Sequence, residues 1–362
     1  AVRPSLPGDP VVAQPPAEGV QWDQFGFSLN GVRTEHMYVA KCRKDENWLP
    51  GSIVPHEALQ IEPASTVLNY GQALFEGLKA LRREDGSITL FRPDMNAKRM
   101  AMGAERLCIP PVPEDIFVNA VISTIQANSQ WVPPYGQGCL YLRPVLFGSG
   151  AGMGVGPSSE YTFCVFCTPV GSYFKSTGKP DDEGSEEADK VTLEKGEALP
   201  SKCEIENVAL PPPISLRAMK RFHRAAEGMT GGIKASGNYA PCFKASKEVK
   251  SAGFNEVLFL DSKFDECVEE AGASNFFAVI DGALHTPDTA RGTILPGVTR
   301  DSILTLAKEE LGLEVVEAPL RSRQLHAASE AFCCGTGAAV TPVGSVNFEA
   351  GDVQAVKFGK AA

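Results

Sequence analysis

The segments CLYLRPVLF (139–147) and EYTFCVFCTPV (160–170) decide the fold class, because they are rich in β-branched and aromatic residues and have the length of strands. The glycine-rich stretch GSGAGMGVG (148–156) separates them. We expect two paired strands around this loop. Its alternating glycines do not fit the G-x-G-x-x-G spacing of a dinucleotide-binding turn, which argues against that kind of site.

Further strands and helices are expected on the N-terminal side of this pair. The segments TEHMYVAKC (34–42) and SITLF (87–91) are typical of strands, and the second follows the turn signal Asp85-Gly86. Residues 93–107 favour a helix. The sequence therefore predicts a mixed α/β fold of the α+β type.

The C-terminal side has the same alternation. We expect a helix near 214–226, a strand at 254–260 and a hairpin with Asp281-Gly282 as its turn. Thr299 is positioned to cap one more helix, which Gly312 is positioned to end.

The composition indicates a globular protein without a strong attraction for polyanions. Of 362 residues, 43% are hydrophobic and 22% are charged, and the formal net charge is −10. This negative charge disfavours nucleic acid as a partner. No window approaches the roughly 18 to 20 apolar residues that a membrane-spanning helix needs, so we expect no membrane span. The length exceeds what one core usually organises, which predicts two domains.

We divide the chain into four parts. Residues 1–21 contain five prolines, so we expect an extended arm there. We expect residues 22–174 to form a small α/β domain and residues 211–362 to form a larger domain. Residues 175–210 between the domains predict an acidic linker. Its portion 175–206 holds ten acidic residues and five lysines, and therefore supplies half of the net charge.

The cysteines and the N-terminus bear on the compartment. Ten scattered cysteines are too few for a disulfide scaffold and fit a reducing compartment. Cys164 and Cys167 have the spacing of a redox pair, but residues three apart on a strand face opposite sides, so we expect buried structural cysteines. The proline-rich start without Met favours a processed protein of a chloroplast (or another plastid) or mitochondrion, although a trimmed cytoplasmic chain would look the same.

Lys234 is the first candidate catalytic residue. The segment TGGIKASGNYAP (230–241) surrounds it with small residues and little charge. Burial would lower the pKa of its ammonium group, and a neutral amine is the form that condenses with a carbonyl, as in pyridoxal 5′-phosphate (PLP) chemistry. The alternative is a solvated loop lysine. Metal catalysis has little support, because the five histidines show no metal-binding spacing.

Two other features could serve the same chemistry. Glu270 could face a ring nitrogen, or it could be a solvated acid at the end of a strand. Gly297 precedes a predicted helix, so the backbone N–H groups of Val298 and Thr299 could hold a phosphate unless this is an ordinary helix start. Thr336 offers one more donor.

With these segments and others, the sequence resembles the branched-chain amino-acid aminotransferases, PLP enzymes of fold type IV. The resemblance extends from about Trp22 to Phe348 and excludes the linker. The matching strings are YGQALFEGLKA (70–80), LFRPDMNAKRM (90–100), RLCIPP (106–111), YLRPVLFGSG (141–150), PVGSYF (169–174), HRAAEGMTGGIKASGNYAP (223–241), EVLFLD (256–261), EEAGASNFF (269–277), GTILPGVTRDSI (292–303) and GTGAAVTPVGSV (335–346).

The resemblance implies a fold and a cofactor site. The fold would be an N-terminal α/β sandwich followed by a C-terminal pseudo-barrel. Lys234 would link covalently to PLP and carry a proton between substrate and cofactor, Glu270 would keep the ring nitrogen protonated, and Tyr239 would hold the ring oxygen. The implied phosphate site consists of Arg92, Val298, Thr299 and Thr336, with Arg224 nearby.

The resemblance also implies the reaction and the partners. The enzyme would reversibly transfer amino groups between L-leucine, L-isoleucine or L-valine and 2-oxoglutarate, in an apolar pocket with one arginine for the glutamate side chain. Those pocket residues would be Tyr70, Phe75, Tyr141, Arg143, Val155, Tyr173 and Gly337. A homodimer is implied, in which Tyr70 and the loop bearing Val155 reach across to the other subunit.

Other interpretations of the same strings remain open. D-amino-acid aminotransferases and aminodeoxychorismate lyases share the fold type, but FEGLKA and YLRPVLF favour the branched-chain enzymes. A catalytically idle relative used as a scaffold is disfavoured by the retained Lys234 and Glu270. The sequence departs from the family at Ala273, where many members carry a hydroxyl, and at Ala338 and Thr341, which replace the C-x-x-C of animal members.

Overall fold

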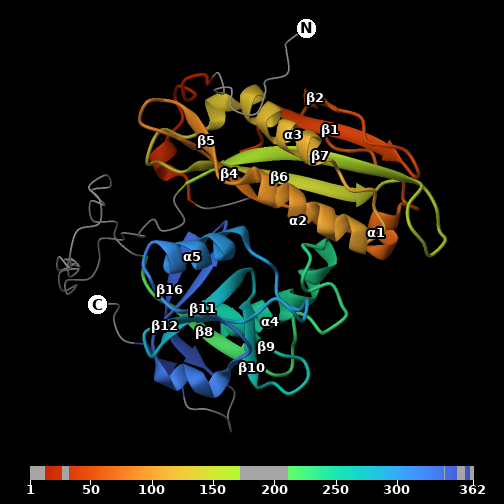
Figure 1. The fold of residues 1–362 in the computed structure, drawn as a ribbon. Coiled ribbons are helices and arrows are strands. Elements are labelled where there is room, and N and C mark those ends of the chain that lie inside the picture. The colour runs from red at the N-terminus through yellow and green to blue at the C-terminus, as the bar shows by residue number, and fades with distance from the viewer. Residues whose placement is uncertain (1–12, 27–31, 172–210, 338, 349–354, 359–362) are drawn as a thin grey trace.

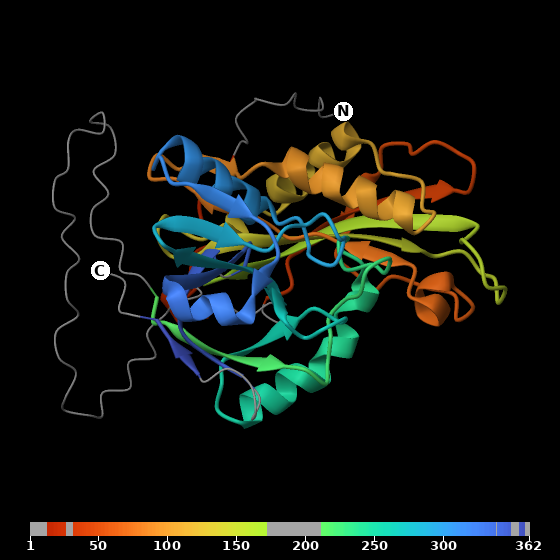
Figure 2. The ribbon, with the colours of Figure 1, turned by 60° about the horizontal axis from the view of Figure 1, so that its bottom comes forward.

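The computed structural model describes residues 13–26, 32–171, 211–337, 339–348 and 355–358. Most of the predicted arm, the whole acidic linker, Tyr173 and Ala338 therefore lie outside the described residues. The chain builds one sheet before the linker and another after it (Figures 1 and 2). We call these parts the N-terminal half (13–171) and the C-terminal half (211–358).

The N-terminal half is a seven-stranded antiparallel sheet with helices. Its strand order is β2-β1-β7-β6-β4-β5, with β3 beside β6. The elements are η1 (Trp22–Gln24), β1 (His36–Arg43), β2 (Ser52–Pro55), α1 (Thr66–Tyr70), β3 (Ala73–Phe75), β4 (Leu78–Arg82), β5 (Ile88–Leu90), α2 (Pro93–Arg106), α3 (Glu114–Ala127), η2 (Ser129–Trp131), β6 (Cys139–Gly148) and β7 (Glu160–Val170). Helices α2 and α3 cover one face of the sheet (Figure 2), where Phe117 of α3 stacks on Phe163 of β7 in the core.

The C-terminal half contains a closed barrel. Strands β8, β9, β10, β11, β15 and β16 each pair with the next, and β16 pairs back with β8. The elements are β8 (Ile214–Met219), η3 (Ser236–Asn238), η4 (Ala240–Cys242), α4 (Phe243–Ser251), β9 (Glu256–Leu260), β10 (Cys267–Ala271), β11 (Ser274–Ile280), β12 (Ala283–Thr286), α5 (Val298–Glu309), β13 (Val315–Glu317), β14 (Leu320–Arg321), η5 (Ser322–Ala327), β15 (Ala328–Gly335), β16 (Ala339–Asn347) and β17 (Val356–Lys357). This architecture confirms the predicted fold class.

Most of the predicted elements are present. The two strand-like segments 139–147 and 160–170 are β6 and β7, paired in antiparallel register across the glycine-rich loop. Asp281 and Gly282 both have positive φ, as a tight hairpin turn between β11 and β12 requires. Cys164 and Cys167 are buried in different apolar clusters, as expected for opposite faces of a strand.

Two local predictions are wrong. Residues 214–219 form strand β8 rather than the start of a helix, because Leu216 and Ala218 alternate into the barrel core while the backbone pairs with β9 and β16. The helix predicted to be capped by Thr299 begins one residue earlier, at Val298, with Gly297 as its N-cap.

The two halves meet beside the segment that bears Lys234. Leu74 of β3 forms a bridge with Ala235, and the Phe75 N–H donates to the carbonyl of Lys234 at 3.2 Å. Lys234 is therefore held by backbone contacts to the opposite half of the molecule. None of the described helices is long and apolar enough to cross a membrane.

Candidate active site

A cavity of about 1250 Å³ lies at the junction of the two halves. The N-terminal half contributes aromatic and basic side chains from β3, β6 and α2, and the C-terminal half contributes the barrel strands and the start of α5. This volume is ample for a cofactor together with an amino acid. Ligand sites commonly lie between domains in this way.

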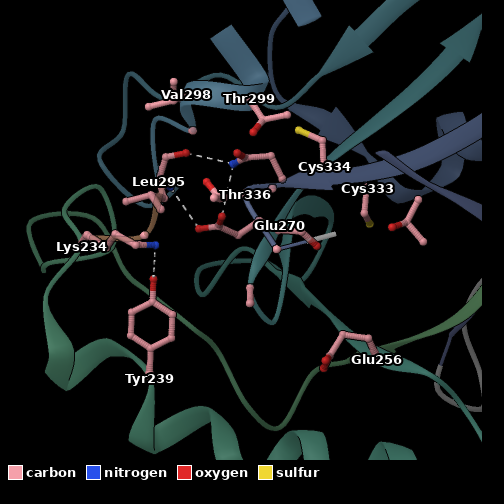
Figure 3. Close-up of a pocket in the computed structure, with 18 of the residues that line it drawn as sticks. Lys234, Tyr239, Glu256, Glu270, Leu295, Val298, Thr299, Cys333, Cys334 and Thr336 are labelled. Carbon is pink, nitrogen blue, oxygen red and sulfur yellow. Dashed lines mark hydrogen bonds between the residues drawn. The ribbon is translucent and has the colours of Figure 1, made fainter. Parts of the chain in front are cut away.

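Lys234 points its amine into this cavity (Figure 3). The surrounding loop is fixed by Asn238, whose side-chain amide donates to the carbonyls of Thr230 and Ile233. The Lys234 Nζ lies 3.2 Å from the Tyr239 hydroxyl. Burial, and next the nearby cation of Arg99, lower the pKa of Lys234 to about 8. An appreciable share of this amine is therefore neutral in mildly alkaline solution, as expected for a buried lysine among small residues.

Glu270 lies on β10 across the cavity and is only 3% exposed. The Leu295 N–H donates to Oε1 at 3.1 Å, and the Asn275 amide donates to Oε2 at 3.3 Å (Figure 3). The Arg224 guanidinium forms an ion pair with Oε1 at 2.7 Å. Burial raises the pKa of Glu270, while Arg224 and the Leu295 N–H oppose that rise by favouring the carboxylate. The result is a buried acid group held rigidly at the wall of the cavity.

The start of α5 and the turn after β15 form the opposite side of the site. Val298, Thr299 and Thr336 line the cavity, and Figure 3 shows them beyond Glu270 as seen from Tyr239. A side chain at Gly297 would meet the Asn275 amide oxygen at 2.2 Å, so this tight approach requires glycine. The free N–H groups of a helix start favour an anion here.

Arg92 lies outside the residues that line this cavity. It occupies the N-cap of α2, and its guanidinium pairs with Asp301 and donates to the Ser302 hydroxyl, both at 2.7 Å. The structure therefore does not bring Arg92 into the predicted phosphate site. The reason is its place at the N-terminal end of α2, from which the side chain reaches Asp301 and Ser302 of α5 instead of the cavity.

Arg99, seven residues later in the same string, lines the cavity instead. Its guanidinium is buried and binds both carboxylate oxygens of Glu76 at 2.7 Å, and it donates to the Pro296 carbonyl at 3.1 Å. Sequence reasoning missed both Arg99 and Glu76. Two arginines two turns apart on one helix were the available signal, but only the fold distinguishes which one faces the site.

The predicted substrate residues fall into two groups. Phe75, Tyr141, Arg143 and Gly337 line the cavity. The Arg143 guanidinium carbon lies 4.8 Å from the Phe75 ring centre and 5.6 Å from that of Tyr141, and its buried Nε has no hydrogen-bond partner among the described residues. This arrangement combines an apolar wall with one cation that has spare capacity to donate.

Tyr70 and Val155 do not line the cavity of this chain. Tyr70 is 44% exposed and its hydroxyl donates to the Met153 carbonyl at 2.5 Å, while Val155 is 90% exposed. Both lie at one end of the N-terminal half, where Ser65 forms a bridge with Ala151. Tyr173 lies outside the described residues.

Lys79 is a further contact that sequence reasoning missed. Its Nζ donates to the Gly337 carbonyl at 2.8 Å, from β4 of the N-terminal half to the turn between β15 and β16. Burial lowers the pKa of this amine. Among the described residues, no cluster of three or more His, Cys, Asp or Glu side chains could hold a metal ion.

Comparison with known proteins gives consistent relatives. The family model described as amino-transferase class IV matches residues 73–346. Branched-chain-amino-acid aminotransferase 6 of Arabidopsis thaliana is 44% identical over 91% of this chain and 82% of the relative. Two more enzymes of the same plant are 42% identical over 91% of this chain: branched-chain-amino-acid aminotransferase 5, chloroplastic (71% of its length), and branched-chain-amino-acid aminotransferase 1, mitochondrial (76%).

Solved structures agree with the sequence relatives. The crystal structure of the Escherichia coli branched-chain amino acid aminotransferase superposes with a TM-score of 0.66 at 26% identity, covering 87% of each chain. The T.th. branched-chain amino acid aminotransferase complexed with N-(5′-phosphopyridoxyl)-L-glutamate superposes with a TM-score of 0.64 at 25% identity, covering 88% of this chain and 87% of the other.

Proposed function

This chain belongs to the class IV aminotransferases, and within them to the branched-chain-amino-acid aminotransferases, and from that premise we propose its substrates. It exchanges amino groups between L-leucine, L-isoleucine or L-valine and 2-oxoglutarate, giving branched 2-oxo acids and L-glutamate. The observation that carries this proposal is that the Lys234 amine and the buried Glu270 carboxylate face one cavity with an apolar aromatic wall.

The residues around the cavity fit PLP as the cofactor. PLP needs an amine to bond its aldehyde, an acid at its ring nitrogen and donors for its phosphate. Lys234 and Glu270 fit the first two needs, and the backbone of Val298 and Thr299 at the helix start fits the third, together with Thr336. When bound, PLP supplies the electron sink that makes the proton on the substrate Cα acidic.

The side chains of this protein then hold and move protons. The Lys234 Nζ, with its pKa lowered to about 8, can accept the proton from the substrate Cα and return it. Tyr239, 3.2 Å away, keeps this amine oriented. The Glu270 carboxylate, favoured by Arg224 at 2.7 Å, keeps a proton on the facing ring nitrogen.

The walls of the cavity support branched substrates. Phe75 and Tyr141 offer apolar surface to a branched side chain, and Arg143 between them offers a cation to the side-chain carboxylate of glutamate. One pocket can in this way accept both amino acids of the exchange. The phosphopyridoxyl-glutamate ligand bound by the T.th. enzyme supports the same pairing of cofactor and substrate.

Assembly and compartment form part of the proposal. The exposed Tyr70 and Val155 support a homodimer in which each subunit helps to line the pocket of the other. Relatives named chloroplastic and mitochondrial at 42% identity support a plastid or a mitochondrion as the compartment.

Reductive trapping tests the proposal. Borohydride treatment of the PLP-loaded protein should attach the cofactor to the peptide that contains Lys234, as read by mass spectrometry. Lys234→Ala should abolish this attachment, while Lys244→Ala, which changes an exposed lysine of α4, should leave it intact. Trapping that persists in Lys234→Ala would overturn the cofactor assignment.

A substrate panel tests the reaction. The wild-type protein should transaminate L-leucine with 2-oxoglutarate and leave D-alanine unused. Turnover of D-alanine in preference to L-leucine would assign the chain to D-amino-acid chemistry instead. Absence of both activities in a protein that holds PLP would favour the scaffold alternative.

A further inference from the structure

Arg92 makes an unusual connection between the two halves. As the N-cap of α2 it has a left-handed backbone, with φ 48° and ψ 52°, which residues other than glycine rarely adopt. Its guanidinium pairs with Asp301 and donates to the Ser302 hydroxyl, each at 2.7 Å. An arginine of the N-terminal half is therefore bound to two consecutive residues of α5.

Both partners of Arg92 belong to the first turns of α5. The Ser302 hydroxyl, which accepts from Arg92, donates to the Val298 carbonyl at 3.0 Å. The Asp301 N–H donates to the Gly297 carbonyl at 2.9 Å. The Arg92 guanidinium is thus connected through Ser302 to Val298, which lines the cavity.

Arg99 holds the other side of the same helix start. It lies two turns after Arg92 on α2, and it donates to the Pro296 carbonyl at 3.1 Å. Its own position is fixed by Glu76, which accepts two hydrogen bonds at 2.7 Å. Arg92 and Arg99 of α2 therefore contact the two ends of the segment 296–302. Residues 297–299 within that segment line the cavity.

We propose that Arg92 is a positioning residue for the anion site at the start of α5, acting through Asp301 and Ser302 without touching the ligand. This inference rests on the proposed function, because the anion in question is the phosphate of the cofactor. Arg92 is 33% exposed and Asp301 50% exposed. An ion pair this exposed contributes little to the free energy of unfolding. We therefore expect the loss of Arg92 to lower ligand affinity and to leave stability unchanged.

The test measures PLP affinity of the apoprotein by fluorescence titration. Arg92→Gln should raise the dissociation constant about tenfold, by analogy with the lower end of the loss seen when residues that orient metal ligands are removed. The same variant should keep its thermal midpoint, and at saturating PLP its kcat should approach that of the wild type. Arg92→Lys, which keeps a cation near Asp301, should restore part of the affinity.

A matched control and a double variant make the result specific. Arg221→Gln removes an exposed pair of similar geometry, with Glu248 at 2.6 Å, and should leave PLP affinity unchanged. In a protein that already carries Ser302→Ala, Arg92→Gln should weaken PLP binding by less than it does in the wild type. The reason is that the Ser302 hydroxyl, which connects Arg92 to Val298, is already absent. Should Arg92→Gln fail to fold, Ser302→Ala alone must still weaken PLP binding.

Two outcomes would overturn the inference. One is wild-type PLP affinity in Arg92→Gln, and the other is an equal loss of affinity in Arg221→Gln. Failure of the proposed function is recognised separately, because the wild-type protein would then fail to hold PLP on Lys234. Titration of each apoprotein with inorganic phosphate provides a readout that does not depend on catalysis, and Arg92→Gln should weaken phosphate binding in the same proportion as PLP.

Discussion

Glu269 and Glu270 are neighbours on β10 and therefore face opposite sides of the strand. Glu270 faces the cavity, whereas Glu269 is buried away from it, with one carboxyl oxygen lacking a hydrogen-bond partner among the described residues. Burial raises the pKa of Glu269 to about 7, against the opposing effect of the Thr293 hydroxyl. This carboxyl is protonated in the folded protein at a pH where the unfolded chain has already lost the proton.

The shift at Glu269 predicts how stability depends on pH. Because its pKa rises from 4.5 when unfolded to about 7 when folded, this residue should make the protein less stable as pH rises through that window, and add no further change above it. Glu269→Gln should flatten this part of the profile, as measured by urea unfolding at a series of pH values. Glu330→Gln, at an exposed position, is the control and should leave the profile unchanged. An unaltered slope in Glu269→Gln would contradict the assignment.

The pair between Arg224 and Glu270 predicts a large effect on stability. Arg224→Met leaves a buried carboxylate without its cation and should lower the free energy of unfolding by about 3 to 5 kcal/mol. The double variant Arg224→Met with Glu270→Gln should lose less, because no charge remains unpaired. Chemical denaturation of both variants checks this. Equal losses in the single and double variants would show that the pair is not the cause.

The local sequence identifies some residues of the site and not others. Lys234 is recognisable because small neighbours mark a buried loop, and Glu270 because it adjoins the predicted hairpin. Arg92 and Arg99 lie in one matching string, and no local property separates an arginine at a helix end from one facing a cavity. The distinction depends on how α2 lies against α5, which is a contact between residues about 200 positions apart.

Among the strands, too, some are predictable from the local sequence and others only from their tertiary partners. Strands β6 and β7 are predictable because their side chains are typical of strands and they pair with each other across a short loop. Strand β8 is not predictable from its own sequence, because its partners β9 and β16 come from later parts of the chain. Its strand conformation is imposed by closing the barrel, a tertiary effect that overrides local propensity.

The link from β4 to the turn between β15 and β16 predicts a kinetic effect. Lys79→Met removes the hydrogen bond to the Gly337 carbonyl, so the turn that bears Thr336 and Gly337 should lose its fixed position. We expect the KM for L-leucine to rise about tenfold, the scale of one hydrogen bond from a charged group. Lys98→Met, on the exposed face of α2, is the control. A normal KM in Lys79→Met would show that the turn is held by its own strands.

The whole molecule combines an acidic chain with a basic cavity. Half of the net charge of −10 comes from the linker. The charged residues that line the cavity are the cations Arg99, Arg143, Arg224, Lys234 and Lys250 and the acids Glu256 and Glu270, and Glu76 pairs with Arg99. Net charge disfavours a polyanion as partner, but it conceals this local excess of cations. An anionic cofactor and acidic substrates suit the cavity for that reason.

An apolar surface lies at one end of the N-terminal half. Helix α1 and the loop between β6 and β7 meet there through the bridge between Ser65 and Ala151 (Figure 1). Large apolar side chains are exposed on both, by 44% to 90%: Leu68, Tyr70, Met153 and Val155. Such a concentration is typical of a surface that another subunit covers.

The dimer proposed from this surface is open to a direct test. Val155→Asp places a charge where the second subunit would pack, so we expect the protein to sediment as a monomer in analytical ultracentrifugation. Because each pocket would then lack the residues lent by its neighbour, transamination should fall steeply. Lys234 and the proposed phosphate site of the same chain should remain able to hold PLP. Leu311→Asp, at a 65% exposed position just after α5, should leave both the dimer and the activity intact. A Val155→Asp protein that sediments as the wild type does, or a monomer with full activity, would refute the shared pocket.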